Sequence, residues 1–215
     1  MKVAVNILSA EKIYAKEKIE DLNEKSIVPK MMMRRRLTRN AKIMLYLADK
    51  CGFKNGKIIY GSAFGELEST VGITDAILNE TPISPTLFQN SVYNSAPSYF
   101  SLLNADKDEI ITLSNGMKTS SDVLKCAALQ SLVSGEAIFC VVTESLNIAR
   151  IDEVNRCSDY LESGAGVVLE ISKDESGAKE IEDLQDEGVI ASLDDLISVV
   201  NMYTKNQELK LFIEL

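Results

Sequence analysis

Six short runs rich in apolar and β-branched residues are spread along the chain, and helical patterns fill most of the segments between them. The runs are Lys2–Leu8, Lys57–Gly61, Glu109–Leu113, Ala137–Thr143, Gly166–Ser172 and Glu208–Glu214. Several are nearly continuous apolar stretches, which suit strands of a sheet that is covered on both faces. The alternation of strand and helix predicts an α/β fold with a largely parallel central sheet.

Five segments carry the apolar periodicity of helices. They are Met32–Cys51, Phe64–Asn79, Ser84–Leu103 with an interruption at Pro97, Lys118–Val133 and Leu193–Tyr203. Gly52 and Gly135 are suitable helix stops, and Ser192 is the expected N-cap of the last helix. These assignments place a helix between most pairs of successive strands.

The 215 residues predict one domain that spans positions 1–215, with a core up to about residue 172 and a C-terminal extension over 173–215. Much of the acidity lies in Lys173–Glu187. We interpret the charged segment Lys173–Gly188 as an exposed loop or surface helix of the same domain, since charge runs usually face solvent.

The net charge of −9 disfavours nucleic acid and anionic membrane as main partners. No apolar run approaches the roughly 20 residues of a membrane helix, and the N-terminus lacks a signal-peptide pattern, so we expect a cytoplasmic protein. The cysteines are Cys51, Cys126, Cys140 and Cys157; none form a C-x-x-C pair, and histidine is absent. We therefore expect no metal site, no cofactor and mostly buried free thiols.

The segment Glu109–Ser121 (EIITLSNGMKTSS) has the pattern of an active-site corner without its active residue. A β-type run meets a Ser-Asn-Gly corner and then opens a long helix. Nucleophiles are often placed at such corners, because a helix N-terminus stabilises developing negative charge. Here the corner carries Met117 and Lys118 instead.

The order of segments resembles the N-terminal half of a β-ketoacyl synthase, in the thiolase-fold superfamily. The likeness is carried by MMMRRRLTRNAKIMLYLADKCGF, KIIYGSAFGELEST, SPTLFQNSVYNSAPSYFSLL, GEAIFCVVTES and ESGAGVVLEISK, and it covers roughly residues 31–172 together with the first strand. The third of these most resembles shortened, catalytically inactive synthase-like proteins of the chain-length-factor type. The resemblance implies half of a thiolase-like fold: a mixed, mostly parallel five-stranded sheet covered by helices, plus a C-terminal helix and strand.

The chain departs from the family where the family does its chemistry. The resemblance implies a nucleophilic cysteine near Lys118, and the next cysteine, Cys126, lies two helical turns further on. The two active-site histidines of the family belong to its C-terminal half, and this chain has no histidine. A thiolate and groups that stabilise an oxyanion are what condensation needs. We therefore expect a catalytically inactive half-synthase with no catalytic residue.

The resemblance also implies two binding regions. The aromatic and apolar residues of the third helical segment would line a dimer interface and the closed end of an acyl tunnel; core packing is the alternative interpretation. They are Phe88, Val92, Tyr93, Tyr99 and Phe100. A basic cluster would dock an acidic acyl carrier protein, with a solvated helix start as the alternative. It consists of Arg34, Arg35, Arg36 and Arg39.

Two further patterns have both a functional and a structural interpretation. Ser114, Thr119, Ser120 and Ser121 surround Lys118 and would give a Ser–Lys hydrolase or, as we favour, help to cap the helix. Gly61–Gly65 follows a strand and would cradle phosphate or form a tight structural turn; it lacks the full glycine-rich or Walker pattern, so we favour the turn.

Three hypotheses of function follow. The first is a non-catalytic subunit that pairs with an active β-ketoacyl synthase and shapes its acyl tunnel, in fatty-acid, polyketide or aryl-polyene-type biosynthesis. The second is a stand-alone binding protein, homodimeric in isolation, that holds an acyl chain or acyl carrier protein. The third, which we favour least, is an acyl-transfer or hydrolytic enzyme that uses a cysteine or serine.

Overall fold

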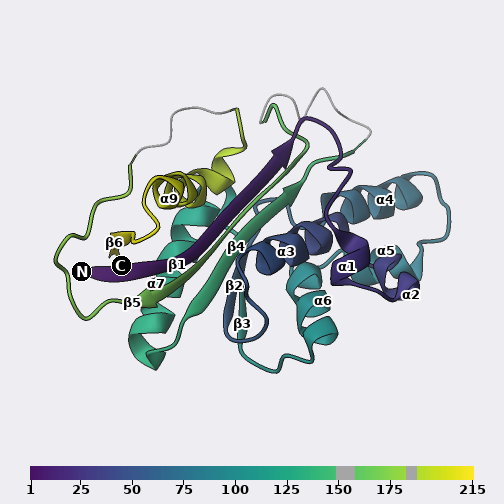
Figure 1. The fold of residues 1–215 in the computed structure, drawn as a ribbon. Helices are drawn as coiled ribbons and strands as arrows, with labels where there is room; N and C mark the ends of the chain where they lie inside the picture. The colour runs from purple at the N-terminus through teal and green to yellow at the C-terminus, as the bar shows by residue number, and fades with distance from the viewer. Residues whose placement is uncertain (149–157, 183–187) are drawn as a thin grey trace.

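The fold is a six-stranded sheet between two layers of helices (Figure 1), in a computed structural model that describes residues 1–148, 158–182 and 188–215. The sheet order is β3-β2-β4-β5-β1-β6. The strands are β1 (Lys2–Ala15), β2 (Ile58–Gly61), β3 (Ile110–Leu113), β4 (Ile138–Ser145), β5 (Glu162–Ile171) and β6 (Lys210–Glu214). All six predicted runs form strands.

The sheet is mixed, as predicted, but it is not mostly parallel, because three of its five strand pairings are antiparallel. Strand β2 pairs in parallel with β3 and β4, whereas β5 is antiparallel to both β4 and β1. Strands β1 to β4 therefore share one direction, and β5 and β6 run the other way. Strand β1 continues well past the predicted end at Leu8, because its second half pairs with β5 as far as Ala15 opposite Glu162.

The helices differ from the predicted segments mainly at two breaks, one at residues 35–38 and one at residues 91–94. They are α1 (Glu24–Ile27), α2 (Met31–Arg34), α3 (Arg39–Lys50), α4 (Leu67–Leu78), α5 (Pro85–Asn90), α6 (Ser95–Asn104), α7 (Thr119–Ser134) and α9 (Asp194–Lys205), with 3₁₀ turns η1 (Gly116–Lys118) and η2 (Ala191–Leu193). Thr38 separates α2 from α3, because its hydroxyl accepts the Ala41 amide and starts a new helix. Pro97 causes no break, since it sits in the first turn of α6, where an amide hydrogen has no helical partner.

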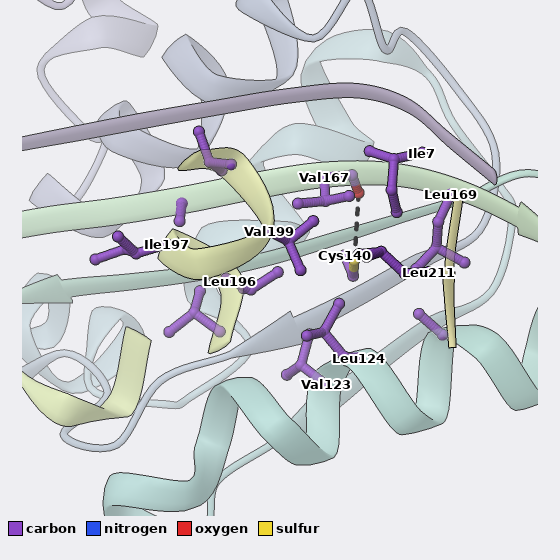
Figure 2. Packing of buried hydrophobic residues seen from close by; sticks show 14 of the residues in the cluster. Ile7, Val123, Leu124, Cys140, Val167, Leu169, Leu196, Ile197, Val199 and Leu211 are labelled. Atoms are coloured by element: carbon purple, nitrogen blue, oxygen red, sulfur yellow. Dashed lines mark hydrogen bonds between the residues drawn. The ribbon is translucent and has the colours of Figure 1, made fainter. Parts of the chain in front are cut away.

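Two hydrophobic clusters lie on opposite faces of the sheet. One packs α7 and α9 against it, and the other packs α3 and α6 on the far side. Figure 2 shows the first cluster, in which Cys140 lies among aliphatic side chains and its thiol donates to the Val167 carbonyl at 3.3 Å. Burial raises the pKa of this thiol. Cys140 therefore behaves as the small hydrophobic residue that the sequence predicted.

The C-terminal helix and strand complete the α7 face. Helix α9 packs on β1 and β5 beside α7, and β6 covers the edge of β1 (Figure 1). The expected N-cap role of Ser192 is wrong: Leu193 occupies that position, and the Ser192 hydroxyl donates to Glu144 instead. The chain ends lie together, with the Leu215 amide donating to the Met1 carbonyl at 2.8 Å.

The remaining predictions on single segments have mixed outcomes. Cys51 is buried and Cys126 is half-buried, whereas Cys157 lies outside the described residues. The acidic segment after β5 is described up to Glu182 and again from Gly188. Within the described ranges, no helix is long and apolar enough to cross a bilayer, and no three potential ligands are grouped as a metal site would need.

Candidate functional site

The corner between β3 and α7 is closed by its own side chains. The Thr119 hydroxyl accepts the Asn115 amide at 3.0 Å and donates to the Gly116 carbonyl at 2.7 Å. Ser120, also buried, accepts the Asp195 amide at 3.2 Å and thereby fixes the start of α9. These hydroxyls hold the corner and the neighbouring helix rather than capping α7, for which no side-chain cap bond is recorded.

Met117 and Lys118 lie exposed in the 3₁₀ turn that leads into α7. In the described part of the chain, no hydrogen bond joins Lys118 to a serine, so nothing there supports a Ser–Lys pair. Cys126 lies further along α7 and packs against the core. Burial raises the pKa of its thiol, and the Glu109 charge adds a smaller effect in the same direction. A raised pKa disfavours the thiolate that a nucleophile requires.

A buried carboxylate, Glu144, joins three distant parts of the fold at the end of β4. One of its oxygens accepts the Ser62 hydroxyl at 2.9 Å and the Phe64 amide at 3.3 Å. The other accepts the Ala63 amide and, at 2.9 Å, the Ser192 hydroxyl. The loop after β2, the end of β4 and the entrance to α9 therefore share one anion. Sequence reasoning missed this residue; its only signal was an acid at the end of an apolar strand.

The Gly61–Gly65 loop is a structural turn, as favoured from the sequence. Its amides at Ala63 and Phe64, which would have to face a phosphate, already donate to Glu144. Gly65 adopts a left-handed φ of 59° and has the Tyr93 ring against it, so a side chain there would be strained and crowded. The carboxylate of Glu144 therefore occupies the position that a phosphate would take in this loop.

A second buried acid, Glu66, follows the same loop. Its carboxylate accepts the Thr38 hydroxyl at 2.7 Å, the one hydrogen bond it accepts from the described residues, and the residue is 6% exposed. Burial raises the pKa of Glu66 to about 7; the Thr38 hydrogen bond opposes this, and the Glu68 and Glu144 charges add to it. Burial likewise raises the pKa of Glu144 to about 7, although its four hydrogen-bond donors lower it.

A folded-state pKa above the unfolded value makes the fold more stable when the acid is protonated. The unfolding free energy should therefore fall as the pH rises from about 4.5 to about 7, and the contribution of these acids should level off above that. The Glu66→Gln variant is expected to match the parent near pH 5 and to exceed it at pH 8 by on the order of 2–3 kcal/mol. Urea unfolding at both pH values measures this.

Glu68→Gln is the matched control, since it removes an exposed carboxylate from the same helix. Its effect should be within about 0.5 kcal/mol at either pH. An equal gain from both variants would mean that general charge reduction, and not burial of Glu66, governs the pH dependence.

The four arginines of the predicted docking cluster have different surroundings. Arg39 is 9% exposed, and its guanidinium forms a bidentate pair with the fully buried Glu162, with Nε donating at 2.6 Å. It also donates to the Ile19 carbonyl at 2.9 Å. Arg39 is therefore a structural residue and not part of an exposed docking surface. Arg34 donates to two backbone carbonyls. Arg35 and Arg36 are exposed, and neither forms a side-chain hydrogen bond with a residue that the structure describes.

The aromatic segment also divides into core and surface. Phe88, Val92 and Tyr93 are 69%, 50% and 42% exposed. Tyr99 is half-buried and donates to the Asn90 side chain at 3.0 Å. Phe100 is 1% exposed and stacks on Phe53 with ring centroids 5.8 Å apart, so it belongs to the core and not to an exposed interface.

The sequence model of the β-ketoacyl synthase N-terminal domain matches residues 10–191, and the chain therefore belongs to this family. The six-stranded sheet covered by helices matches the thiolase-like fold of ketosynthases. A search of curated protein sequences found no match.

Solved structures of similar fold include complexes of ketosynthases. A structure of the ketosynthase ApeO with its chain length factor ApeC from Xenorhabdus doucetiae matches with a TM-score of 0.62 and 20% identity, over 79% of this chain and 80% of that chain. The type II polyketide synthase complex AntDE:AntF, an acyl-carrier protein with its ketosynthase, matches with a TM-score of 0.61 and 13% identity, over 96% of this chain and 83% of that chain. The ishigamide ketosynthase/chain length factor matches with a TM-score of 0.58 and 12% identity, over 82% of this chain and 63% of that chain. At these identities the likeness establishes the fold.

Proposed function

We propose that this chain is a non-catalytic ketosynthase-like subunit, a chain-length factor, that pairs with an active β-ketoacyl synthase and shapes its acyl tunnel. The pathway would be of the fatty-acid, polyketide or aryl-polyene type. One observation carries the proposal: Met117 and Lys118 occupy the 3₁₀ turn that leads into α7, where the resemblance to active synthases implies a cysteine.

The chemistry of the corner supports an inactive site. A thiolate gains stability from the positive end of a helix, whereas the ammonium of Lys118 does not. The 215 residues contain no histidine that would assist a thioester exchange. Burial raises the pKa of all three described cysteine thiols, which are those of Cys51, Cys126 and Cys140. Chemistry at an acyl thioester is therefore assigned to the partner.

The partner surface is proposed to include the exposed residues of the aromatic segment. Phe88, Val92 and Tyr93 present large apolar groups to solvent around α5. Ile77, Leu78 and Ile83 add further exposed apolar groups from α4, which packs on α5, and from the connection between them. Exposed apolar patches commonly mark protein interfaces. The solved relatives named above are themselves complexes of ketosynthases with partner proteins, which supports this choice of partner.

Arg35 and Arg36 are the proposed contacts for an acyl carrier protein. Both guanidinium groups are exposed in a chain with a net charge of −9. A local positive patch on an acidic protein favours an acidic partner and speeds its association.

We further propose that residues 1–215 fold as one domain whose C-terminal extension is part of the core. Leu196, Ile197 and Val199 of α9 are fully buried against the sheet beside α7. Without this helix, the α7 face of the sheet would expose a large apolar area, which would need a cover.

Co-expression with a tagged ketosynthase from the same genome tests the pairing. We expect a stable 1:1 complex, and we expect Phe88→Asp to weaken it at least about tenfold, because a charge would be buried at the interface. Leu132→Asp is the matched control, since Leu132 is an exposed apolar residue of α7, outside the proposed surface. Size-exclusion chromatography with light scattering gives the stoichiometry.

A discrete homodimer with no affinity for any ketosynthase of that genome would contradict the proposal. It would favour the alternative of a stand-alone protein that binds an acyl chain or a carrier protein. Condensation of malonyl and acyl units by the purified chain alone would refute the inactive site. A serine- or thiol-reactive acyl probe would refute it too, if the labelling maps to one residue and is lost when that residue is substituted.

A further inference from the structure

Residues of α3, of α6 and of the segment that joins α1 to α2 line a hollow of about 770 Å³. Helices α3 and α6 lie on the side of the sheet away from α7 (Figure 1). The volume of the hollow is in the range of small-molecule sites. The lining is mainly apolar and includes Ile27, Met33, Leu45, Phe53, Leu102 and Leu103. No residue of the β3–α7 corner lines it, so it is separate from that corner, although Arg36 of the basic cluster and Phe100 of the aromatic segment are among its lining residues.

The floor of the hollow is part of the rigid core. Leu45, Ala48 and Phe100 line it and are 4%, 1% and 1% exposed, whereas Leu102 at the rim is 65% exposed. One wall, Val28–Pro29, is held by Arg34, whose Nη1 donates to both carbonyls at 2.6 Å. The hollow is therefore formed by braced backbone and core side chains.

The charges at the rim are mainly positive. Lys30, Arg36 and Lys54 all line the hollow and are exposed, and Asp49 is its one acidic lining residue. No ion pair is recorded for these three cations within the described ranges, whereas other lysines of the chain, such as Lys42 and Lys57, pair with glutamates. An apolar floor with cations at its rim is complementary to a molecule with an alkyl chain and a negative head group.

We propose that this hollow binds a single-chain anionic amphiphile, with the alkyl chain on the floor formed by Leu45, Phe53 and Phe100 and the anionic group between Lys30 and Lys54. Burial of the chain supplies the affinity, and the two ammonium groups supply selectivity for a negative head. The inference stands apart from the proposed pairing with a ketosynthase, because it concerns the isolated chain and a different region.

Isothermal titration calorimetry with the purified full chain tests the proposal. Dodecanoate below its aggregation concentration is expected to bind saturably at one site. The double variant Lys30→Glu/Lys54→Glu should bind it at least about tenfold more weakly. Leu102→Glu, at the exposed rim, should weaken it similarly. Lys107→Glu/Lys173→Glu, which makes the same change in net charge at exposed positions away from the hollow, should bind like the parent.

Two further probes test whether the head group must be negative and whether the alkyl chain comes from a free fatty acid or from an acyl carrier. Dodecyltrimethylammonium has the same chain with a positive head and should bind at least about tenfold more weakly. S-Dodecanoyl-4′-phosphopantetheine carries the same chain as a thioester, with its phosphate at the far end of the pantetheine arm. If it binds more tightly than dodecanoate, the source is carrier-borne acyl chains, and the opposite order indicates free fatty acids.

Absence of saturable binding by both anionic probes would overturn the proposal. Equal binding of the cationic detergent, or unchanged binding by the Lys30/Lys54 double variant, would overturn it as well. Thermal melting of each variant confirms that a loss of binding is not a loss of the fold.

Discussion

The Arg39→Met variant is expected to lose about 3–5 kcal/mol of unfolding free energy, because removal of one partner leaves the other charge buried and uncompensated. Glu162 is fully buried, and Arg39 donates to both of its carboxylate oxygens. Among the described residues, the backbone amide of Ile19, at 2.8 Å, would be the one remaining hydrogen-bond donor to this carboxylate. Methionine keeps much of the length of the side chain, so urea unfolding at pH 7 reports mainly on the charge.

Two controls isolate the ion pair. Arg35→Met, at an exposed neighbouring position, is expected to change the unfolding free energy by no more than about 0.5 kcal/mol. The double variant Arg39→Met/Glu162→Gln should be more stable than Arg39→Met alone, since no unpaired charge is left. If the double variant is as unstable as the sum of both single variants, the residues act independently and the argument from pairing fails.

The Phe100→Ala variant is expected to destabilise the fold by about 3–5 kcal/mol, the cost of removing a buried aromatic side chain. The Phe100 ring stacks on Phe53, which in turn stacks on Phe139 with centroids 4.8 Å apart. The substitution therefore leaves a cavity at the end of an aromatic row between α6 and the sheet. Chemical denaturation with a fluorescence or circular dichroism signal measures the loss.

Phe88→Ala is the matched comparison, because both residues belong to the aromatic segment that the sequence marked as an interface. Phe88 is 69% exposed, and its replacement should change stability by no more than about 0.5 kcal/mol. A large loss from Phe88→Ala together with a small one from Phe100→Ala would contradict the division of this segment into surface and core.

The sequence was informative about the corner of the candidate site and uninformative about its supports. The strand–turn–helix pattern placed Met117 and Lys118 at the start of a helix, and the structure has them in the 3₁₀ turn that leads into α7. Glu144 and Glu66 were not identified, because an acid in a sequence is normally a solvated one. Their role depends on donors that only the fold brings near: the Ala63 amide is 81 residues from Glu144 in the chain.

The basic cluster shows the same limit within one run of residues. Arg34, Arg36 and Arg39 look alike in sequence, but one braces a loop, one lines a hollow and one is buried on Glu162, 123 residues away. Periodicity separates the buried side of a helix from its exposed side, but it does not reveal that an arginine on the buried side forms an ion pair with a distant acid.

The sequence by itself determined the class of fold and the order of its strands and helices, because continuous apolar runs and amphipathic helices are each stable only when buried in layers. It also determined that the corner at α7 lacks a cysteine and the chain lacks histidine. Tertiary structure alone decided which acids and arginines are buried, where the apolar hollow lies and that α9 covers the sheet beside α7. Those features depend on contacts between segments far apart in the chain, and local sequence patterns carry no record of such contacts.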